Sequence, residues 1–302
     1  MDRHILNLIA LLSFSLLTQT ESTEFKIVNK CRQTIWPGTL SGSGTTALST
    51  AGFSLKPSKS KTLTIPKSWS GRLWARTHCI TNSTTHQFTC ATADCGSGQV
   101  SCAGAGAIPP ATLVEFTLNG DRNLDFYDVS LVDGYNLPVL IVPRGGTGGG
   151  CAATGCLVDL NLACPNDLRF GDGMACKSAC EAFGQDQYCC TGSFSTPETC
   201  SPSAFSLYFK HACPRAYSYA YDDKTSTYTC EGADYLIIFC PSPYTSQKLL
   251  GARREAAELP LVNKTMMYLG SQHSSYAVST GLLPTKFALL LLLPSLSSWL
   301  FL

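Results

Sequence analysis

The sequence predicts a mainly β protein with a flattened sandwich or barrel core, a disulfide-rich subdomain with one short helix, and a small loop region held by its own disulfides. Two observations predict this fold. Short runs of β-branched and aromatic residues recur through the middle of the chain, separated by Gly, Pro, Asn and Ser. All 16 cysteines lie between Cys31 and Cys240. An even number at this density predicts eight disulfides formed in an oxidising compartment.

The first element along the chain is a secretion signal. A short polar start with one firm positive charge, Arg3, precedes an apolar run from Ile5 to Leu17, and small residues follow. This pattern predicts a signal peptide over residues 1–22 and a mature chain that begins near Thr23. The apolar run is too short for a membrane-spanning helix, which needs about 20 residues. We therefore expect a secreted, extracellular protein.

Strands are expected next, because seven runs combine β-type residues with flanking turn residues. These runs are 24–28, 72–77, 112–118, 126–132, 139–142, 227–229 and 235–239. Their spacing favours a sandwich or barrel. The predicted sandwich core comprises residues 23–76, 103–150 and 216–240, and the small loop region comprises residues 77–102.

The glycine-rich stretch from Gly145 to Gly150 predicts a flexible joint, and the chain changes character after it. Cysteines become dense from Cys151 to Cys200, and residues 175–183 are the one helical candidate. Residues 151–215 are therefore predicted to form the disulfide-rich subdomain. The cross-linked region is long enough to bury a substantial core, so the disulfides do not compensate for small size alone.

The residues after Cys240 predict a tether. Residues 241–275 are mostly polar, and the chain closes on an apolar tail from Phe287 to Leu302 with no charge behind it. Small residues, a polar spacer and a terminal apolar tail direct replacement of the tail by a glycosylphosphatidylinositol (GPI) anchor. We predict attachment at Ser275, with Ser274 or Ser279 as alternatives, and a propeptide over residues 276–302. The protein would then be displayed at the outer face of the plasma membrane. A membrane-spanning helix and a secreted tail are the competing interpretations.

The charge balance excludes two classes of partner. Residues 23–240 contain 16 Lys or Arg and 17 Asp or Glu, a net charge near −1. Nucleic acid and bulk anionic membrane both require a basic surface, so we expect neither as a partner. Contact with a membrane is expected only through the lipid anchor. Asn82 and Asn263 begin glycosylation sequons.

Alternation along two predicted strands indicates which side chains leave the core. In the run 112–118 the fully apolar set is Val114, Phe116 and Leu118, which should face inward and leave Glu115 outside. In the run 72–77, Arg72 belongs to the more polar set.

Two aspartates are expected in different local structures. Asp128 lies within a predicted strand, whereas Asp133 precedes Gly134 and is expected to begin a turn. Periodicity alone does not bring these acids together with Glu115.

Several motifs point to one known family. The segment CATADCGSGQVSC occupies residues 90–102, and further motifs are IVNKC at 27–31, LWART at 73–77, PPATLVEF at 109–116, DFYDVS at 125–130, VDGYN at 132–136, YCC at 188–190 and CPRAYSY at 213–219. Together they resemble the thaumatin-like proteins, the class-five pathogenesis-related proteins of plants. The sixteen cysteines are also that family's full complement. One residue departs from the family signature: His86 stands where glycine is usual, which questions a tight turn before Cys90.

The resemblance implies a disulfide pattern that spacing alone leaves open. The implied pairs are Cys31–Cys240, Cys79–Cys90, Cys95–Cys102, Cys151–Cys230, Cys156–Cys213, Cys164–Cys176, Cys180–Cys189 and Cys190–Cys200. The first pair would join the two ends of the core, and resistance to heat and protease should follow. Metal binding is the competing use of cysteine. We expect no metal and no cofactor, because every cysteine has a family disulfide partner.

The resemblance also implies a binding site. Five residues match the family's electronegative groove between the sandwich and the disulfide-rich subdomain: Arg72, Glu115, Asp128, Asp133 and Asp223. Carboxylates accept hydrogen bonds from sugar hydroxyls, and Arg72 can hold a carboxylate by a forked ion pair. The competing interpretation is a structural cluster of ion pairs.

Two functional hypotheses follow from the resemblance. The first is a monomeric, antifungal defence protein of the plant cell surface that binds β-1,3-glucan, another wall polysaccharide or a membrane receptor through the groove. The second is a weak endo-β-1,3-glucanase with Glu115 as general acid and Asp128 or Asp133 as base or nucleophile. The chain shows no independent catalytic motif, so binding is the favoured hypothesis.

Overall fold

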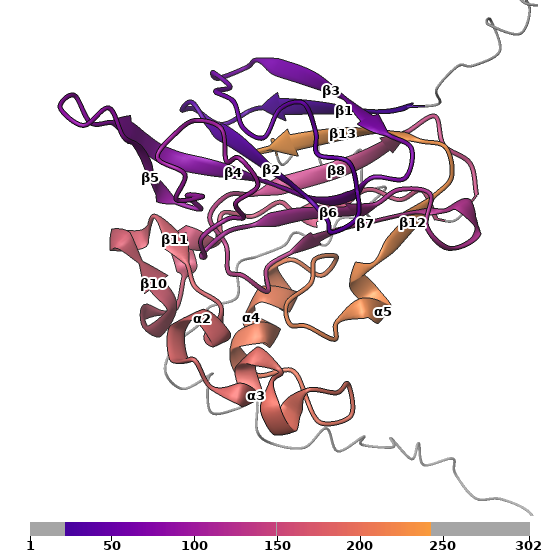
Figure 1. Cartoon of the computed structure of the whole chain (residues 1–302). Helices are drawn as coiled ribbons and strands as arrows, with labels where there is room; N and C mark the ends of the chain where they lie inside the picture. Colours follow the sequence, from indigo (N-terminus) through magenta and orange to yellow (C-terminus); the bar gives the residue numbers. More distant parts are fainter. Residues whose placement is uncertain (1–21, 149, 243–302) are drawn as a thin grey trace, which may run out of the picture.

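The computed structural model describes residues 22–148 and 150–242 (Figure 1). The predicted signal peptide up to residue 21, the sequon at Asn263 and the predicted anchor signal lie outside the described residues. In the described ranges, no helix combines the length and the apolar character needed to cross a bilayer.

Two β-sheets pack face to face, which confirms the predicted mainly β fold. One sheet has the order β3-β1-β13-β8-β9, and in it β1 and β13 run parallel while the other neighbours are antiparallel. Its strands are β1 (Ser22–Asn29), β3 (Ser60–Pro66), β8 (Val139–Arg144), β9 (Thr154–Cys156) and β13 (Asp234–Phe239).

The second sheet is antiparallel and carries the residues of the predicted groove. Its order is β12-β7-β6-β4-β2, and β5 pairs with the far end of β4. The strands are β2 (Trp36–Ser41), β4 (Ser70–Thr81), β5 (Phe88–Thr92), β6 (Leu113–Thr117), β7 (Asp125–Ser130) and β12 (Tyr228–Cys230).

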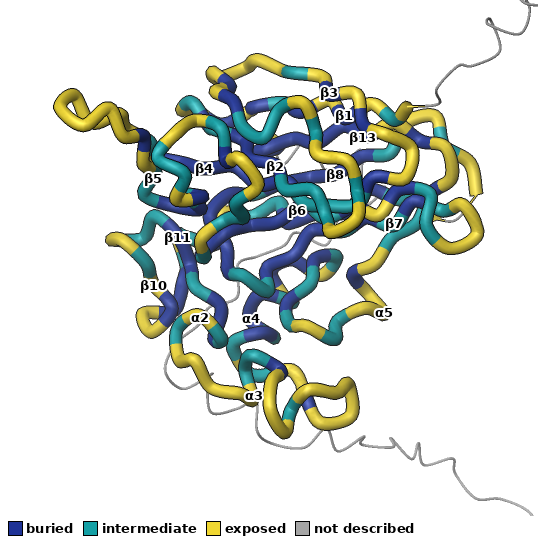
Figure 2. The backbone as a smooth tube through the Cα atoms, viewed as in Figure 1, coloured by how far each residue is buried: buried dark blue, intermediate teal, exposed yellow. Residues whose placement is uncertain are grey.

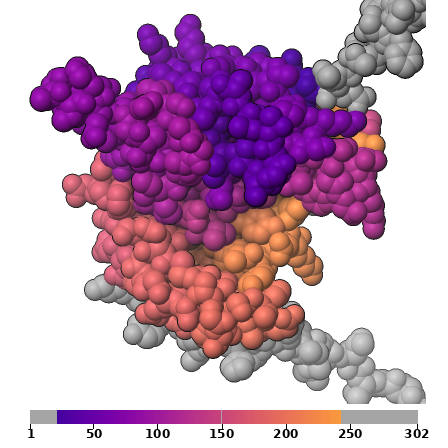
Figure 3. Space-filling view, in the orientation of Figure 1, coloured from indigo at the N-terminus to yellow at the C-terminus, as the bar shows by residue number. Residues whose placement is uncertain are grey.

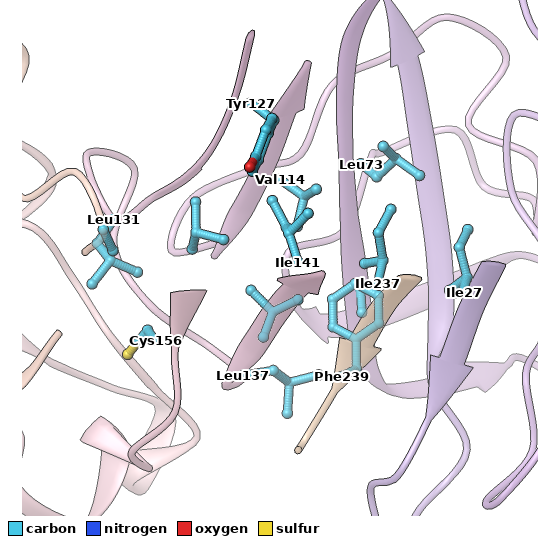
Figure 4. Close-up of a cluster of buried hydrophobic side chains, with 14 of the residues drawn as sticks. Ile27, Leu73, Val114, Tyr127, Leu131, Leu137, Ile141, Cys156, Ile237 and Phe239 are labelled. Atoms are coloured by element: carbon cyan, nitrogen blue, oxygen red, sulfur yellow. The ribbon is translucent and has the colours of Figure 1, made fainter. Parts of the chain in front are cut away.

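Aromatic side chains fill the space between the sheets. Phe25 and Tyr235 come from the first sheet and Phe116 and Tyr127 from the second, with ring centroids 4.3 Å apart for Phe25–Phe116 and 4.8 Å for Phe116–Tyr235. Figure 4 shows aliphatic residues of both sheets meeting beside them. One buried hydrogen bond crosses the sandwich, from Tyr235 Oη to Asp125 Oδ2 at 2.9 Å.

Short helices and loops cover one side of the sandwich (Figure 1). The longest is α4 (Ala204–Ala212), which begins with a reciprocal capping box between Ser203 and Ser206. The others on this side are α2 (Ala179–Phe183), α3 (Asp186–Cys189), α5 (Asp223–Ser226), η2 (Leu160–Ala163), η3 (Asn166–Leu168), η4 (Gly171–Gly173) and η5 (Gly192–Phe194), with a small hairpin of β10 (Arg169–Phe170) and β11 (Ala175–Cys176). A further short helix, η1 (Asp121–Asn123), lies in the connection between β6 and β7.

The eight disulfides of the structure are the same eight pairs that the resemblance implies. Cys31–Cys240 closes the parallel pair β1–β13 just beyond the ends of both strands. Four disulfides lie within residues 156–213, where strands and helices are short: Cys156–Cys213, Cys164–Cys176, Cys180–Cys189 and Cys190–Cys200. Figure 2 shows long exposed stretches of this region around α2 and α3, where the cross-links hold short helices and loops together.

Three local predictions need correction. The helical candidate 175–183 is helical only from Ala179, because Ala175 and Cys176 pair in the β10–β11 hairpin and Ser178 caps α2. β9 lies within residues 151–215 but belongs to a sheet of the sandwich. The described part of the glycine stretch is not a free joint, since Thr147 exchanges two backbone hydrogen bonds with Glu231.

The turn before Cys90 is retained despite His86. The His86 backbone N–H donates to the carbonyl oxygen of Asn82 at 2.9 Å. His86 has a φ of 57°, the left-handed conformation in which glycine is unstrained. His86 therefore lies in a tight turn although it is not glycine.

Candidate functional site

Three groove residues form one row across neighbouring strands of the second sheet. In the antiparallel register Arg72 of β4 lies opposite Glu115 of β6, and Glu115 lies opposite Asp128 of β7. Side chains at directly opposed positions project from the same face with Cβ atoms about 5 Å apart. The β-strand pairing therefore places one guanidinium and two carboxyl groups next to one another.

The sheet face that carries Arg72, Glu115 and Asp128 is partly buried. Val114, Phe116 and Leu118 are in the main core, as predicted. On the opposite face, however, Glu115 is half-buried, and Trp74, two residues after Arg72, is fully buried in a second apolar cluster. Glu115 therefore lies outside the main core, as predicted, but it is half-buried because it lines a cleft on this face.

Asp133 reaches the row from a turn. The chain leaves β7 at Ser130 and turns over residues 131–134, closed by a hydrogen bond of 3.0 Å from the Gly134 N–H to the Leu131 carbonyl. Gly134 has a φ of 84°, which glycine adopts without strain. Asp133 does lie in a turn, but the turn begins at Leu131, so Asp133 is its third residue and not its first as predicted.

Asp223 is positioned by the segment that precedes α5. The Tyr217 N–H donates to the Val129 carbonyl and the Leu131 N–H donates to the Tyr217 carbonyl, both at 2.9 Å, so this segment lies along the end of β7. The Tyr217 hydroxyl then donates to Asp223 Oδ1 at 2.8 Å. Tyr217 thereby links the second sheet to Asp223 on the opposite wall.

A partly buried ion pair also fixes the segment before α5. Lys210 Nζ lies 2.8 Å from Asp222 Oδ2, with the two side chains 18% and 10% exposed. Lys210 also donates to the Ala216 carbonyl at 3.1 Å, and Asp222 accepts hydrogen bonds from the backbone and hydroxyl of Ser218. These bonds bracket Tyr217, so Lys210 and Asp222 hold the wall that carries Tyr217 and Asp223.

All five predicted groove residues line a single cleft of about 360 Å³, named here the carboxylate cleft. Its other lining residues are Leu113, Ser130, Val132, Tyr217 and Ala220. It lies between the second sheet and the segment before α5, along the seam between the magenta and orange parts of the surface in Figure 3. The site therefore consists of residues far apart in the sequence.

Burial raises the pKa values of three carboxyl groups in the cleft. Desolvation is the main cause for each of them. The pKa of Asp128 rises to about 8, because the charges of Glu115 and Asp223 add to the effect of burial. The pKa values of Glu115 and Asp133 are also raised by burial, and the positive charge of Arg72 opposes both shifts.

Two features show that the polar groups of the carboxylate cleft are only partly compensated within the protein. Among the described residues no ion pair within 4.0 Å joins Arg72 to a carboxylate, so the forked ion pair that we expected is absent and Arg72 acts at longer range. Asp128 Oδ2 is buried and has no hydrogen-bond partner in the described structure. A buried oxygen without a donor is costly. This cleft therefore does not have the closed hydrogen bonding of a structural ion-pair cluster.

Sequence reasoning missed Tyr217 as a cleft residue. It lies within the CPRAYSY motif, but nothing in the motif alone indicates that its backbone continues the hydrogen bonding of β7. The predicted sequon residue Asn82 lies far from the cleft in the exposed loop between β4 and β5, where its side-chain oxygen accepts the N–H groups of Thr84 and Thr85. In the described ranges no group of three or more His, Cys, Asp or Glu side chains could hold a metal ion.

Comparison with known proteins identifies the family. The sequence profile of the Thaumatin family matches residues 29–241, and the chain belongs to this family. The chain is 57% identical to thaumatin-like protein 1 of Arabidopsis thaliana over 75% of its own length and 89% of that protein. It is 55% identical to pathogenesis-related thaumatin-like protein 3.5 of Cryptomeria japonica over 73% of its own length and 91% of that protein.

A solved structure also aligns with most of the chain. The thaumatin-like xylanase inhibitor TLXI aligns with 72% of this chain and 99% of its own, with 20% sequence identity and a TM-score of 0.40.

Proposed function

We propose that this protein is a secreted plant defence protein that binds β-1,3-glucan or a related wall polysaccharide through the carboxylate cleft. Its relatives include a protein named as pathogenesis-related. The proposal is carried by one observation: five polar side chains from four separate segments converge on one cleft. A protein that only needed to fold would satisfy these groups internally.

The chemistry of the cleft suits a polyhydroxylated ligand. At neutral pH a carboxyl group with a pKa of about 8 carries its proton, so Asp128 can donate one hydrogen bond and accept others. Glu115 and Asp133 supply acceptors, and Arg72 supplies donors. A sugar hydroxyl also donates and accepts, so it can satisfy the buried oxygen of Asp128 that no described residue reaches.

Binding without hydrolysis is the function we favour. A retaining glycosidase needs one protonated carboxyl and one ionised nucleophile. The cleft shifts the pKa values of Glu115, Asp128 and Asp133 in the same upward direction, whereas acid–base catalysis separates the two partners.

Hydrolysis is the second candidate, and one observation supports it. Asp128 and Glu115 lie opposite each other, and only Asp128 has its pKa raised to about 8. A catalytic cleft would therefore use Asp128 as general acid and Glu115 as nucleophile, the reverse of the assignment made from the sequence.

The proposal is tested by measuring the affinity of the secreted protein for a soluble β-1,3-glucan by titration calorimetry. Asp133→Asn should lower the affinity by about tenfold, because hydrogen bonds to charged groups contribute about 1.5–3 kcal/mol. Asp121→Asn is the matched control, since Asp121 is 76% exposed and lies outside the cleft. Equal affinities for wild type and Asp133→Asn, or no binding by wild type, would contradict the proposal.

A further inference from the structure

A second pocket continues the carboxylate cleft along the strands. It has a volume of about 340 Å³ and shares Arg72, Glu115 and Asp128 with the cleft. The row of these three residues therefore stands between two adjoining hollows on one face of the sheet. We call the second hollow the hydroxyl pocket; its own lining includes Ser41, Gly42, Ser43, Ser70, Thr117 and Phe126.

Strand register explains how the two pockets join. Ser70 lies opposite Thr117, and Thr117 lies opposite Phe126, so these residues form a second row two positions along from the first. Rows separated by two residues are about 7 Å apart. Leu113 and Ser130 are also opposed and form a third row on the other side. The groove thus runs parallel to β4, β6 and β7 and crosses three rows, a length of about 13 Å.

The chemistry changes along this groove. The carboxylate cleft contributes Asp133 and Asp223, whereas the hydroxyl pocket contributes no acid beyond the shared row. Ser70 Oγ and Thr117 Oγ1 lie 3.4 Å apart and Thr117 is exposed. Phe126 is the large aromatic side chain at the same place, and it is only half-buried. Hydroxyl groups beside a partly exposed aromatic ring match a neutral sugar, which has polar edges and an apolar face.

The wall of the hydroxyl pocket is held before any ligand arrives. The indole Nε1 of the fully buried Trp69 donates to Ser41 Oγ at 2.8 Å, and the Gly42 N–H donates to the Ser70 carbonyl at 2.7 Å. Thr45 Oγ1 donates to the Ser70 carbonyl at 3.0 Å. A wall fixed in this way loses little conformational entropy on binding.

We propose that the hydroxyl pocket is a second sugar subsite, so that the protein binds a linear oligosaccharide whose neutral units continue from the carboxylate cleft over Thr117 and Phe126. This inference rests on the proposed function and adds to it a requirement for chain length. A short oligosaccharide occupies only the carboxylate cleft, and a longer one also covers the row of Ser70, Thr117 and Phe126.

The test is a titration of the secreted protein with linear β-1,3-gluco-oligosaccharides of increasing length. Affinity should rise with length until both pockets are covered and then stay constant. Thr117→Val removes one hydroxyl from an exposed strand position and should lower the affinity for long oligosaccharides by about fivefold. Phe126→Leu should weaken the same oligosaccharides, and both variants should bind the shortest one like wild type. Thr64→Val on the exposed face of β3 is the matched control and should change neither affinity.

The outcomes separate this inference from the proposed function. Binding that does not strengthen beyond the shortest oligosaccharide, or long oligosaccharides that bind Thr117→Val and Phe126→Leu as tightly as wild type, would overturn the second subsite and leave the proposed function intact. No binding at any length would overturn both. The unfolding curve of Phe126→Leu should match that of wild type. A weaker affinity then reports the loss of contacts in the hydroxyl pocket and not a loosened sheet.

Discussion

Glu115 and Asp128 lie directly opposite each other on β6 and β7, with both side chains half-buried under the segment before α5. Two carboxyl groups at opposed positions of a sheet repel each other when both are ionised. Burial is the main cause that raises the pKa of Asp128 to about 8, and the charges of Glu115 and Asp223 add to it. The site therefore keeps a proton that an exposed aspartate would lose.

The first prediction concerns stability and pH. Because the pKa of Asp128 is higher in the folded protein than in the unfolded chain, the unfolded state loses its proton first and stability falls as pH rises from about 4 to 8. Asp128→Asn keeps the shape and removes this ionisation. The variant should match wild type near pH 4 and be more stable at pH 8 by a free energy of unfolding on the order of a few kcal/mol. Guanidinium unfolding at the two pH values measures this.

Asp121→Asn is the control for this experiment, since Asp121 is exposed and lies outside the carboxylate cleft. If the difference in the free energy of unfolding between wild type and Asp128→Asn is the same at pH 4 and at pH 8, the prediction is contradicted, because Asp128 would then titrate as an ordinary aspartate.

The second prediction concerns the hydrogen bond that crosses the sandwich. Tyr235→Phe removes the donor to Asp125 Oδ2 and leaves a buried carboxyl oxygen without it. The free energy of unfolding should drop by about 2 kcal/mol. Tyr221→Phe loses an exposed hydrogen bond to the Ser195 carbonyl and should cost less than about 0.5 kcal/mol. Similar unfolding midpoints for the two variants would mean that the Tyr235–Asp125 bond adds nothing to stability.

The third prediction concerns the wall of the carboxylate cleft. Lys210→Met leaves Asp222 without its partner in a partly buried position, which should lower the free energy of unfolding by about 3 kcal/mol. The bonds that bracket Tyr217 would loosen, so affinity for β-1,3-glucan should fall although Lys210 does not line the cleft. Lys224→Met changes an exposed lysine of α5 and should leave both quantities unchanged. Unchanged glucan affinity in Lys210→Met would argue against a positioning role.

The fourth prediction concerns the Cys31–Cys240 disulfide. The bond closes almost the whole described chain into one loop, with a sequence separation of 209 residues. Replacing both cysteines by serine should lower the free energy of unfolding by about 5 kcal/mol in the chain-entropy model and expose β1 and β13 to protease. The double variant should therefore be cut near one terminus while the wild type resists. Equal proteolysis rates would show that the neighbouring strands hold the ends without the bond.

The sequence predicted the fold well where local patterns agree with the tertiary structure. The runs that became β1, β4, β6, β7, β8, β12 and β13 are rich in β-branched or aromatic residues. β2 was missed because it begins Trp36-Pro-Gly, which favours a turn, and β3 because its polar residues Ser60, Lys61 and Thr62 hide an alternating pattern. Helix α4 was missed because Phe205, Tyr208 and Phe209 are residues typical of strands.

The site was less accessible to sequence reasoning. The family resemblance supplied the five residues, but only strand register shows that Arg72, Glu115 and Asp128 are neighbours. A shift of one position in a strand would move its side chains to the other face, and nothing in the local sequence fixes the pairing partner. The role of Tyr217 depends on a bridge to Ser130 from a segment 87 positions away in the sequence, which no local pattern encodes.

One measurement tests the central claim most directly: the secreted protein is incubated with β-1,3-glucan, and retention on the polysaccharide and new reducing ends are measured together. The account predicts retention without new reducing ends, weakened in Asp133→Asn and retained in Asp121→Asn. New reducing ends that disappear in both Glu115→Gln and Asp128→Asn would contradict it and make the cleft the active site of a glucanase.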